Sequence, residues 1–298
     1  MSQFSAYVDY LSLEKKYSPH TVTAYIKDLE AFSEFCLKTY DSGLIQDCAY
    51  SQIRSWIVFL LEEGVGNRTV NRKVASLKSY YKFLLKAEQI KIFPLLQHKA
   101  LKVAKKVQVP FSVKEMENVL GELYFEDTFE GVRDRLMIEF FYATGMRKAE
   151  LIALKVSDVN LSNNTVKVLG KRNKERIVPL VASLNRCMCD YLGKRSELVD
   201  GVDCENLFLT KRGAKVYNSL VYRVINSYFS KASSKLKKSP HVLRHTFATH
   251  LLNEGADLNA VKELLGHTSL AATQVYVHNS MAKLKETYQN SHPRNTKT

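Results

Sequence analysis

The chain of 298 residues is 45% hydrophobic and 25% charged, a composition that is typical of a folded protein and excludes a disordered one. Its length favours two domains, each large enough to bury a core of its own. The net charge of +14 is shared by both halves, because 16 basic and 10 acidic residues precede position 111 and 28 and 20 follow it. This charge indicates an acidic partner, of which nucleic acid is the commonest.

The sequence also indicates where the protein works. No apolar run reaches the roughly 18 residues of a membrane span, and the N-terminus lacks a signal-peptide pattern. Five cysteines without a CxxC pair fit a reducing compartment. Cys187 and Cys189 could form half of a metal site, but no second pair completes it. We therefore expect a cytoplasmic protein with no membrane contact, no metal and no other cofactor.

The N-terminal part, residues 1–93, is predicted to form a helical domain. In "SPHTVTAYIKDLEAFSEFC", Ser18 is placed to cap a helix whose first residue is Pro19. Further helices are expected over 50–62 and, with Asn67 as its cap, over 68–86.

Basic side chains lie along the third of these helices, mostly outside its apolar stripe. The pattern by itself favours a solvated helix face, but the net charge favours phosphate contact. The predicted DNA-binding residues here are Arg68, Arg72 and Lys73.

The segment 94–111 is predicted to be an exposed basic linker. It contains prolines and lysines and no acidic residue, and we place the domain boundary near residue 106. The C-terminal domain, 112–298, then begins with Ser112 as a helix cap, followed by an apolar helix over 129–143.

A β-hairpin is expected over 163–180, with a basic turn "GKRNKE". Val166 and Val168 alternate with polar residues on the first strand, as do Ile177 and, less cleanly, Leu180 on the second. The rest of the chain has a helical pattern, so the fold class is mainly α with a small β-hairpin or sheet.

Several polar residues of the C-terminal part occur in apolar, helical surroundings. Arg147 follows a helix end in "YATGMRKAELIAL", and His241 and Arg244 lie three residues apart in "SPHVLRHTFATHLL". Arg147 could simply pair with Glu150. His241 and His245 have the spacing of a zinc pair, but the glutamate that metalloproteases require after the first histidine is absent.

Together these residue types suit one reaction, the cleavage of a phosphodiester without metal. That reaction requires cations for the non-bridging oxygens, a nucleophile, a base for its proton and an acid for the leaving alkoxide. Arginine suits the cationic role because its planar fork binds two oxygens and keeps its charge. A tyrosine nucleophile would preserve the ester energy, so rejoining needs no ATP, and no GxxxxGK[ST] loop is present.

The order of these motifs closely resembles the tyrosine recombinase, or phage integrase, family, most of all its bacterial Xer type. The resemblance lies in "TGMRKAELIAL", "LGKRNKERIVPL", "HVLRHTFATHLL" and "LLGHTSLAATQVYVH", and the N-terminal part resembles the family's SAM-like core-binding domain. The implied catalytic residues are Arg147, Lys171, His241, Arg244, His267 and Tyr276.

The resemblance also implies their roles. Tyr276 attacks the scissile phosphate and becomes linked to a DNA 3′-phosphate, while Arg147 and Arg244 bind the phosphate oxygens. Lys171 protonates the 5′-oxygen, His241 acts as the base, and His267 assists the phosphate contact. Where the family commonly has glycine, this hairpin has an arginine that must fit the turn or contact DNA, Arg172.

Partners follow from the resemblance as well. They are a double-stranded DNA recombination site, a tetrameric synaptic complex with identical or related recombinases, and a DNA translocase as an optional regulator. The implied process is chromosome dimer resolution, with integration of a mobile element as the alternative. The other hypotheses are a non-catalytic DNA-binding protein and a nuclease that hydrolyses DNA with histidines or a metal. A magnesium-dependent nuclease requires carboxylates that the sequence does not cluster.

Overall fold

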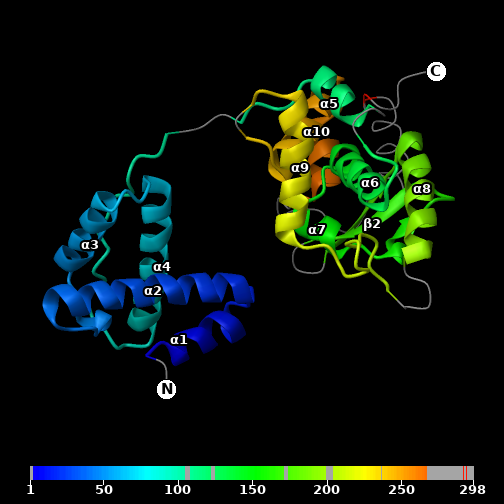
Figure 1. Ribbon diagram of the computed structural model, residues 1–298. Coiled ribbons are helices and arrows are strands. Elements are labelled where there is room, and N and C mark those ends of the chain that lie inside the picture. Colours follow the sequence, from blue (N-terminus) through cyan, green and yellow to red (C-terminus); the bar gives the residue numbers. More distant parts are fainter. Residues whose placement is uncertain are drawn as a thin grey trace. The chain divides into compact units, whose positions relative to one another are not determined.

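The computed structural model describes residues 3–104, 108–121, 125–170, 174–198, 204–235, 237–266, 291 and 293. The chain divides into two compact units, Met1–Lys106 and Val107–Thr298 (Figure 1). Within the described residues, no helix is both long enough and apolar enough to cross a membrane.

The N-terminal unit is built from helices around one apolar core that includes Phe32, Trp56 and Tyr81. The predicted start of α2 is confirmed, because the Ser18 hydroxyl accepts a hydrogen bond from the Thr21 N–H and Pro19 is the first helical residue. The elements are α1 (Ser5–Asp9), a π-helical turn (Tyr10–Glu14), α2 (Pro19–Tyr40), a 3-10 turn (Ile45–Asp47), α3 (Tyr50–Glu62) and α4 (Asn67–Lys86).

The start of α4 differs from the prediction. Gly66 is the residue before the helix, and Asn67 is its first helical residue. The Asn67 side chain donates instead to the carbonyl of Lys102, at 2.8 Å. A contact with a distant segment thus replaces the local cap that the sequence predicted.

The segment that was predicted to be a linker makes further contacts with the N-terminal unit. Leu95 is buried in the N-terminal core, and the Asn71 side chain exchanges two hydrogen bonds with the main chain of Leu101, at 2.8 and 2.9 Å. The segment up to Lys102 therefore contacts the N-terminal unit at these residues, while Leu96, Lys99 and Lys102 remain exposed. At the other end, Phe111 is fully buried in the core of the C-terminal unit.

Helices also dominate the C-terminal unit, and α6 runs through its core in contact with α8 and α10 (Figure 1). The predicted cap of α5 is confirmed by reciprocal hydrogen bonds between Ser112 and Glu115. The helices are α5 (Val113–Leu120), α6 (Phe129–Thr144), α7 (Lys148–Ala153), a 3-10 turn (Val156–Asp158), α8 (Ala182–Leu198), α9 (Asn218–Ala232), α10 (Pro240–Asn253) and α11 (Leu258–Leu265).

A small antiparallel sheet has the order β1-β2-β3 in the described part of the unit. The hairpin of β2 (Thr165–Leu169) and β3 (Glu175–Pro179) is confirmed, and the sequence missed the short strand β1 (Val159–Asn160). The mainly helical fold with a small sheet is thus as predicted.

The register of the hairpin places Ile177 on the exposed face of β3. Val168 pairs with Arg176 and Val166 with Val178, so these residues share one face of the sheet. Ile177 pairs with Lys167 on the other face and is 48% exposed. Side chains alternate along a strand, and therefore Arg176 is directed toward the core side of the sheet.

Candidate active site

Arg147 lies between α6 and α7, where its side chain is fixed by a nearby carboxylate. Its Nη1 donates to Glu150 Oε1 at 2.7 Å, and its main-chain N–H donates to Glu150 Oε2 at 2.7 Å. Glu150 is buried, whereas the Arg147 side chain keeps 28% of its surface exposed. The pairing considered from the sequence is therefore present, and it still leaves part of the guanidinium open to solvent.

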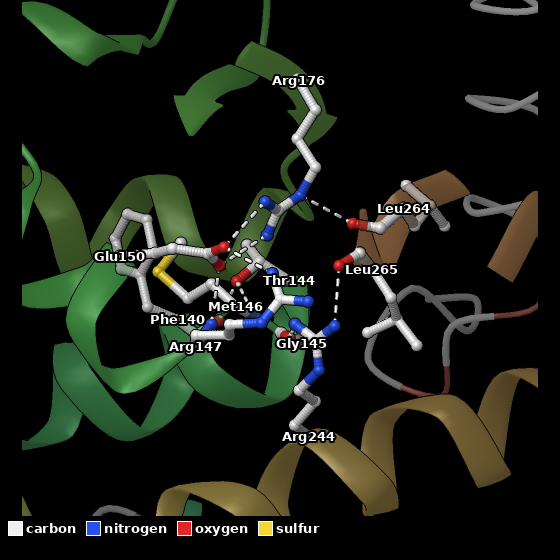
Figure 2. A network of polar contacts seen from close by, with 10 residues as sticks. All are labelled: Phe140, Thr144, Gly145, Met146, Arg147, Glu150, Arg176, Arg244, Leu264 and Leu265. Atoms are coloured by element: carbon white, nitrogen blue, oxygen red, sulfur yellow. Dashed lines mark hydrogen bonds and ion pairs between the residues drawn. The ribbon is translucent and has the colours of Figure 1, made fainter. Parts of the chain in front are cut away.

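A second arginine, not singled out from the sequence, completes the coordination of Glu150. Nη1 and Nη2 of Arg176 donate to the two carboxylate oxygens of Glu150, at 3.1 and 2.7 Å. The Nε of Arg176 donates to the carbonyl of Leu264, at 2.9 Å. Figure 2 shows how Arg176 thus joins the sheet to the beginning of α7 and the end of α11.

Arg244 enters the same region from α10. Its Nη1 donates to the carbonyl of Gly145 and its Nη2 to the carbonyl of Leu265, both at 2.7 Å. These bonds use two of the five N–H groups of a guanidinium. The side chain is only 9% exposed, so main-chain carbonyls at the ends of two helices determine where its charge lies (Figure 2).

Two glycines form these helix ends. Gly145 ends α6 with φ of 58°, at the helix end expected before Arg147, and Gly266 ends α11 with φ of 62°. Gly145 is also required sterically, because a Cβ there would overlap the Phe247 ring and lie 2.8 Å from Leu265 Cδ2. The carbonyl that holds Arg244 can occupy its place only with glycine at this position.

The site has an excess of positive charge. Three guanidinium groups converge around a single carboxylate, Glu150 (Figure 2). Burial, and then the charge of Arg147, lower the pKa of Arg244 to about 10, so it remains protonated at neutral pH. Burial by itself would raise the pKa of Glu150, but hydrogen bonds from Arg176 and Arg147 lower it overall. A buried cation that interacts mainly with carbonyls is a favourable binding partner for an anion.

His241 lies at the first turn of α10, one helical turn before Arg244, and is exposed. The other predicted catalytic residues, Lys171, His267 and Tyr276, lie outside the described residues, as does Arg172. The described parts of the chain contain no group of three metal-ligating side chains that could hold an ion.

The basic residues predicted to contact DNA in α4 have different surroundings. Asp28 is buried and accepts hydrogen bonds from both Nη atoms of Arg72, at 2.5 and 3.1 Å, from Lys73 at 3.1 Å and from Ser76 at 2.8 Å. The Lys73 side chain is only 18% exposed and lies over the Trp56 ring. Arg72 keeps half of its side chain exposed, and Arg68 is exposed.

This fold and this cluster of arginines define a class of protein. The chain belongs to the phage integrase family, whose profile matches residues 112–283, while the profile of the phage integrase N-terminal SAM-like domain matches residues 4–88. It is a site-specific tyrosine recombinase that cuts and rejoins DNA.

Individual relatives are of the Xer type, as the sequence predicted. The chain is 40% identical to the tyrosine recombinase XerC of Bacillus licheniformis, over 97% of this chain and 95% of that protein. It is 36% identical to XerC of Bacillus subtilis, over 97% and 95%. Among solved structures, it resembles the XerH site-specific recombinase bound to palindromic difH substrate in a post-cleavage complex, with a TM-score of 0.72 and 25% identity over 90% of this chain and 78% of that one.

Proposed function

We propose that this recombinase forms a covalent 3′-phosphotyrosyl intermediate through Tyr276, in a site where Arg147 and Arg244 bind the scissile phosphate. The proposal is supported by the fixed positions of these two arginines. Arg147 is partly exposed at the start of α7, and the buried Arg244 is held by carbonyls at the ends of α6 and α11. Their charges offset the negative charge that grows on the non-bridging oxygens in the transition state.

The remaining roles complete the proton transfers. Tyr276 Oη bonds to phosphorus as its proton passes to His241, and the bond from phosphorus to the 5′-oxygen breaks as Lys171 protonates that oxygen. His267 adds a contact to the phosphate. In the return step, a DNA 5′-hydroxyl attacks phosphorus as its proton passes to Lys171, and the bond from phosphorus to Tyr276 Oη breaks as His241 returns the proton to that oxygen. The ester is thus re-formed without ATP or metal.

The nucleophile can be tested with nicked DNA duplexes. Their sequences are taken from DNA fragments that the protein binds selectively. On a denaturing gel, the wild type is expected to give a covalent adduct, which mass spectrometry places on Tyr276. Tyr276→Phe should bind the same DNA and give none. Tyr222→Phe, which changes a half-exposed tyrosine of α9, is the matched control and should cleave normally. Strong cleavage by Tyr276→Phe would exclude this nucleophile.

The general acid is tested separately with Lys171→Ala. This variant should cleave ordinary DNA slowly, because the 5′-alkoxide is a poor leaving group without a proton. A substrate with sulfur in place of the 5′-oxygen has a leaving group of lower pKa and should restore much of the rate. An equally slow reaction with the sulfur substrate would contradict the role of Lys171.

Assembly and biological role are proposed from the same similarity. We infer that the protein acts in the cytoplasm on double-stranded recombination sites, within a tetramer of identical or related recombinases, and resolves chromosome dimers, optionally under a DNA translocase. Similarity to XerC proteins over nearly their whole length supports this role. A plasmid with two recombination sites distinguishes the two kinds of tetramer. Recombination by the protein alone indicates identical subunits, and recombination only after a related recombinase from the same cell is added indicates a mixed tetramer.

A further inference from the structure

We propose that Arg176 is a positioning residue for the phosphate site, holding Arg147 through Glu150 and stabilising the end of α11 that holds Arg244. The inference rests on the proposed function, because it assumes that these two arginines bind the scissile phosphate. Only 12% of the Arg176 side chain is exposed, and each of its three guanidinium nitrogen atoms donates to Glu150 or to the Leu264 carbonyl.

The first part of this role concerns Glu150. The two oxygens of this buried carboxylate accept from both Nη atoms of Arg176 on one side and from Arg147 on the other. Without Arg176, Glu150 would interact with Arg147 alone and would compete with a phosphate for that guanidinium. Arg176 therefore neutralises the carboxylate, so that Glu150 can orient Arg147 without cancelling its charge.

The second part concerns the end of α11. Leu264 and Leu265 are adjacent residues whose carbonyls accept from Arg176 and Arg244, at 2.9 and 2.7 Å. A helix leaves its last carbonyls without intrahelical partners, and here two arginines from different elements satisfy them. Any shift of this helix end on loss of Arg176 would therefore move the carbonyl that fixes Arg244.

The geometry explains why this residue is an arginine. Its planar fork makes a bidentate contact with Glu150 while Nε is directed at a different acceptor, which the single ammonium of lysine cannot reproduce. The backbone leaves it little freedom, because β3 directs Arg176 to the same face as Val168 and Val178. A lysine would keep the charge of the site but lose the fixed geometry.

The test compares Arg176→Lys with the wild type, Arg147→Ala and Arg244→Ala on two nicked substrates. One has an ordinary scissile phosphate. The other has a methylphosphonate, which lacks the negative charge of the phosphate, so its cleavage depends less on nearby cations. On the ordinary phosphate, Arg176→Lys should cleave about 100-fold more slowly than the wild type, with unchanged DNA affinity. On the methylphosphonate, the deficits of all three variants should shrink by about tenfold or more.

This pattern separates positioning from loss of structure, because a partly unfolded enzyme would be equally deficient on both substrates. Arg195→Lys is the matched control, since Arg195 also donates to main-chain carbonyls, those of Cys204 and Asn206. It should cleave both substrates as the wild type does. If Arg176→Lys does not fold, the double variant Arg176→Met, Glu150→Met removes both charges together, and it should show the same substrate dependence.

Several outcomes would overturn the inference. A folded Arg176→Lys that cleaves the ordinary phosphate at the wild-type rate would do so, as would a deficit of equal size on both substrates. A folded double variant with the wild-type rate would also overturn it. These results are distinct from failure of the proposed function, in which the wild type itself would form no adduct on Tyr276.

Discussion

At the scale of single residues, Gly145 has both a conformational and a steric role. Its φ of 58° is costly for a residue with a side chain, and a Cβ would overlap Phe247 and approach Leu265. We therefore expect Gly145→Ala to lower the free energy of unfolding by roughly 2 to 5 kcal/mol, the sum of backbone strain and overpacking. Urea unfolding measures this change, and cleavage should also decrease because the Gly145 carbonyl holds Arg244.

Gly213 provides the control for this prediction. Its φ is 73°, but a Cβ there would meet no atom within 4 Å. Gly213→Ala should therefore lose only about 1 to 2 kcal/mol, from the backbone conformation alone. Equal losses for the two variants would show that the packing around Gly145 is not restrictive.

At the scale of elements, the start of α5 is joined to the segment after α9 by an ion pair between Glu115 and Lys235. Although burial opposes it, hydrogen bonds from Lys235 and from the helix start lower the pKa of Glu115 to about 2. Glu115→Gln should lower the free energy of unfolding by about 1 to 3 kcal/mol at pH 7. Chemical denaturation of both proteins at several pH values measures the difference.

The sign of the pH dependence follows from the lowered pKa. The carboxylate of Glu115 is favoured in the folded state, so its contribution is complete above the ordinary glutamate pKa of 4.5 and is lost as the pH falls toward about 2. The deficit of Glu115→Gln should shrink over that range. Glu205→Gln, which removes an exposed pair with Lys155, should have little effect at any pH. A deficit for Glu115→Gln that stays constant with pH would contradict the assignment.

At the scale of the whole molecule, the net charge of +14 should make DNA binding strongly dependent on salt. Arg68 is exposed on α4, so Arg68→Ala should weaken binding to all sequences alike and reduce the slope of log K against log salt by about one. Binding titrations over a range of salt concentrations measure both effects.

Lys73 provides the contrast, because it is largely buried against Asp28 and Trp56. Lys73→Ala should lower the stability of the N-terminal unit, since it removes one partner of a buried carboxylate. We expect it to change the salt dependence of DNA binding less than Arg68→Ala. The reverse order would place the DNA contact at Lys73.

Local signals predicted most of the elements correctly. Ser18, Ser112 and Gly145 begin or end helices where the sequence indicated, because caps and left-handed glycines depend on nearby atoms only. The errors involve distant contacts. Asn67 bonds to Lys102 instead of capping α4, and β3 turns Arg176 inward because its register with β2 is set across the hairpin. The alternation of Arg176 with Val178 and Leu180 was the signal that could have revealed it.

The sequence by itself determined the helical character of both units, the hairpin, the family and two of the three arginines that converge at Glu150, because periodicity, capping and motif spacing are properties of neighbouring residues. Only the tertiary structure decided how those side chains are used. Arg176 reaches Glu150 and Leu264 across 26 and 88 positions, and Arg244 reaches Gly145 across 99. Lys73 reaches Asp28 across 45 positions and is thereby buried. Such pairings depend on how elements pack, which no local pattern encodes.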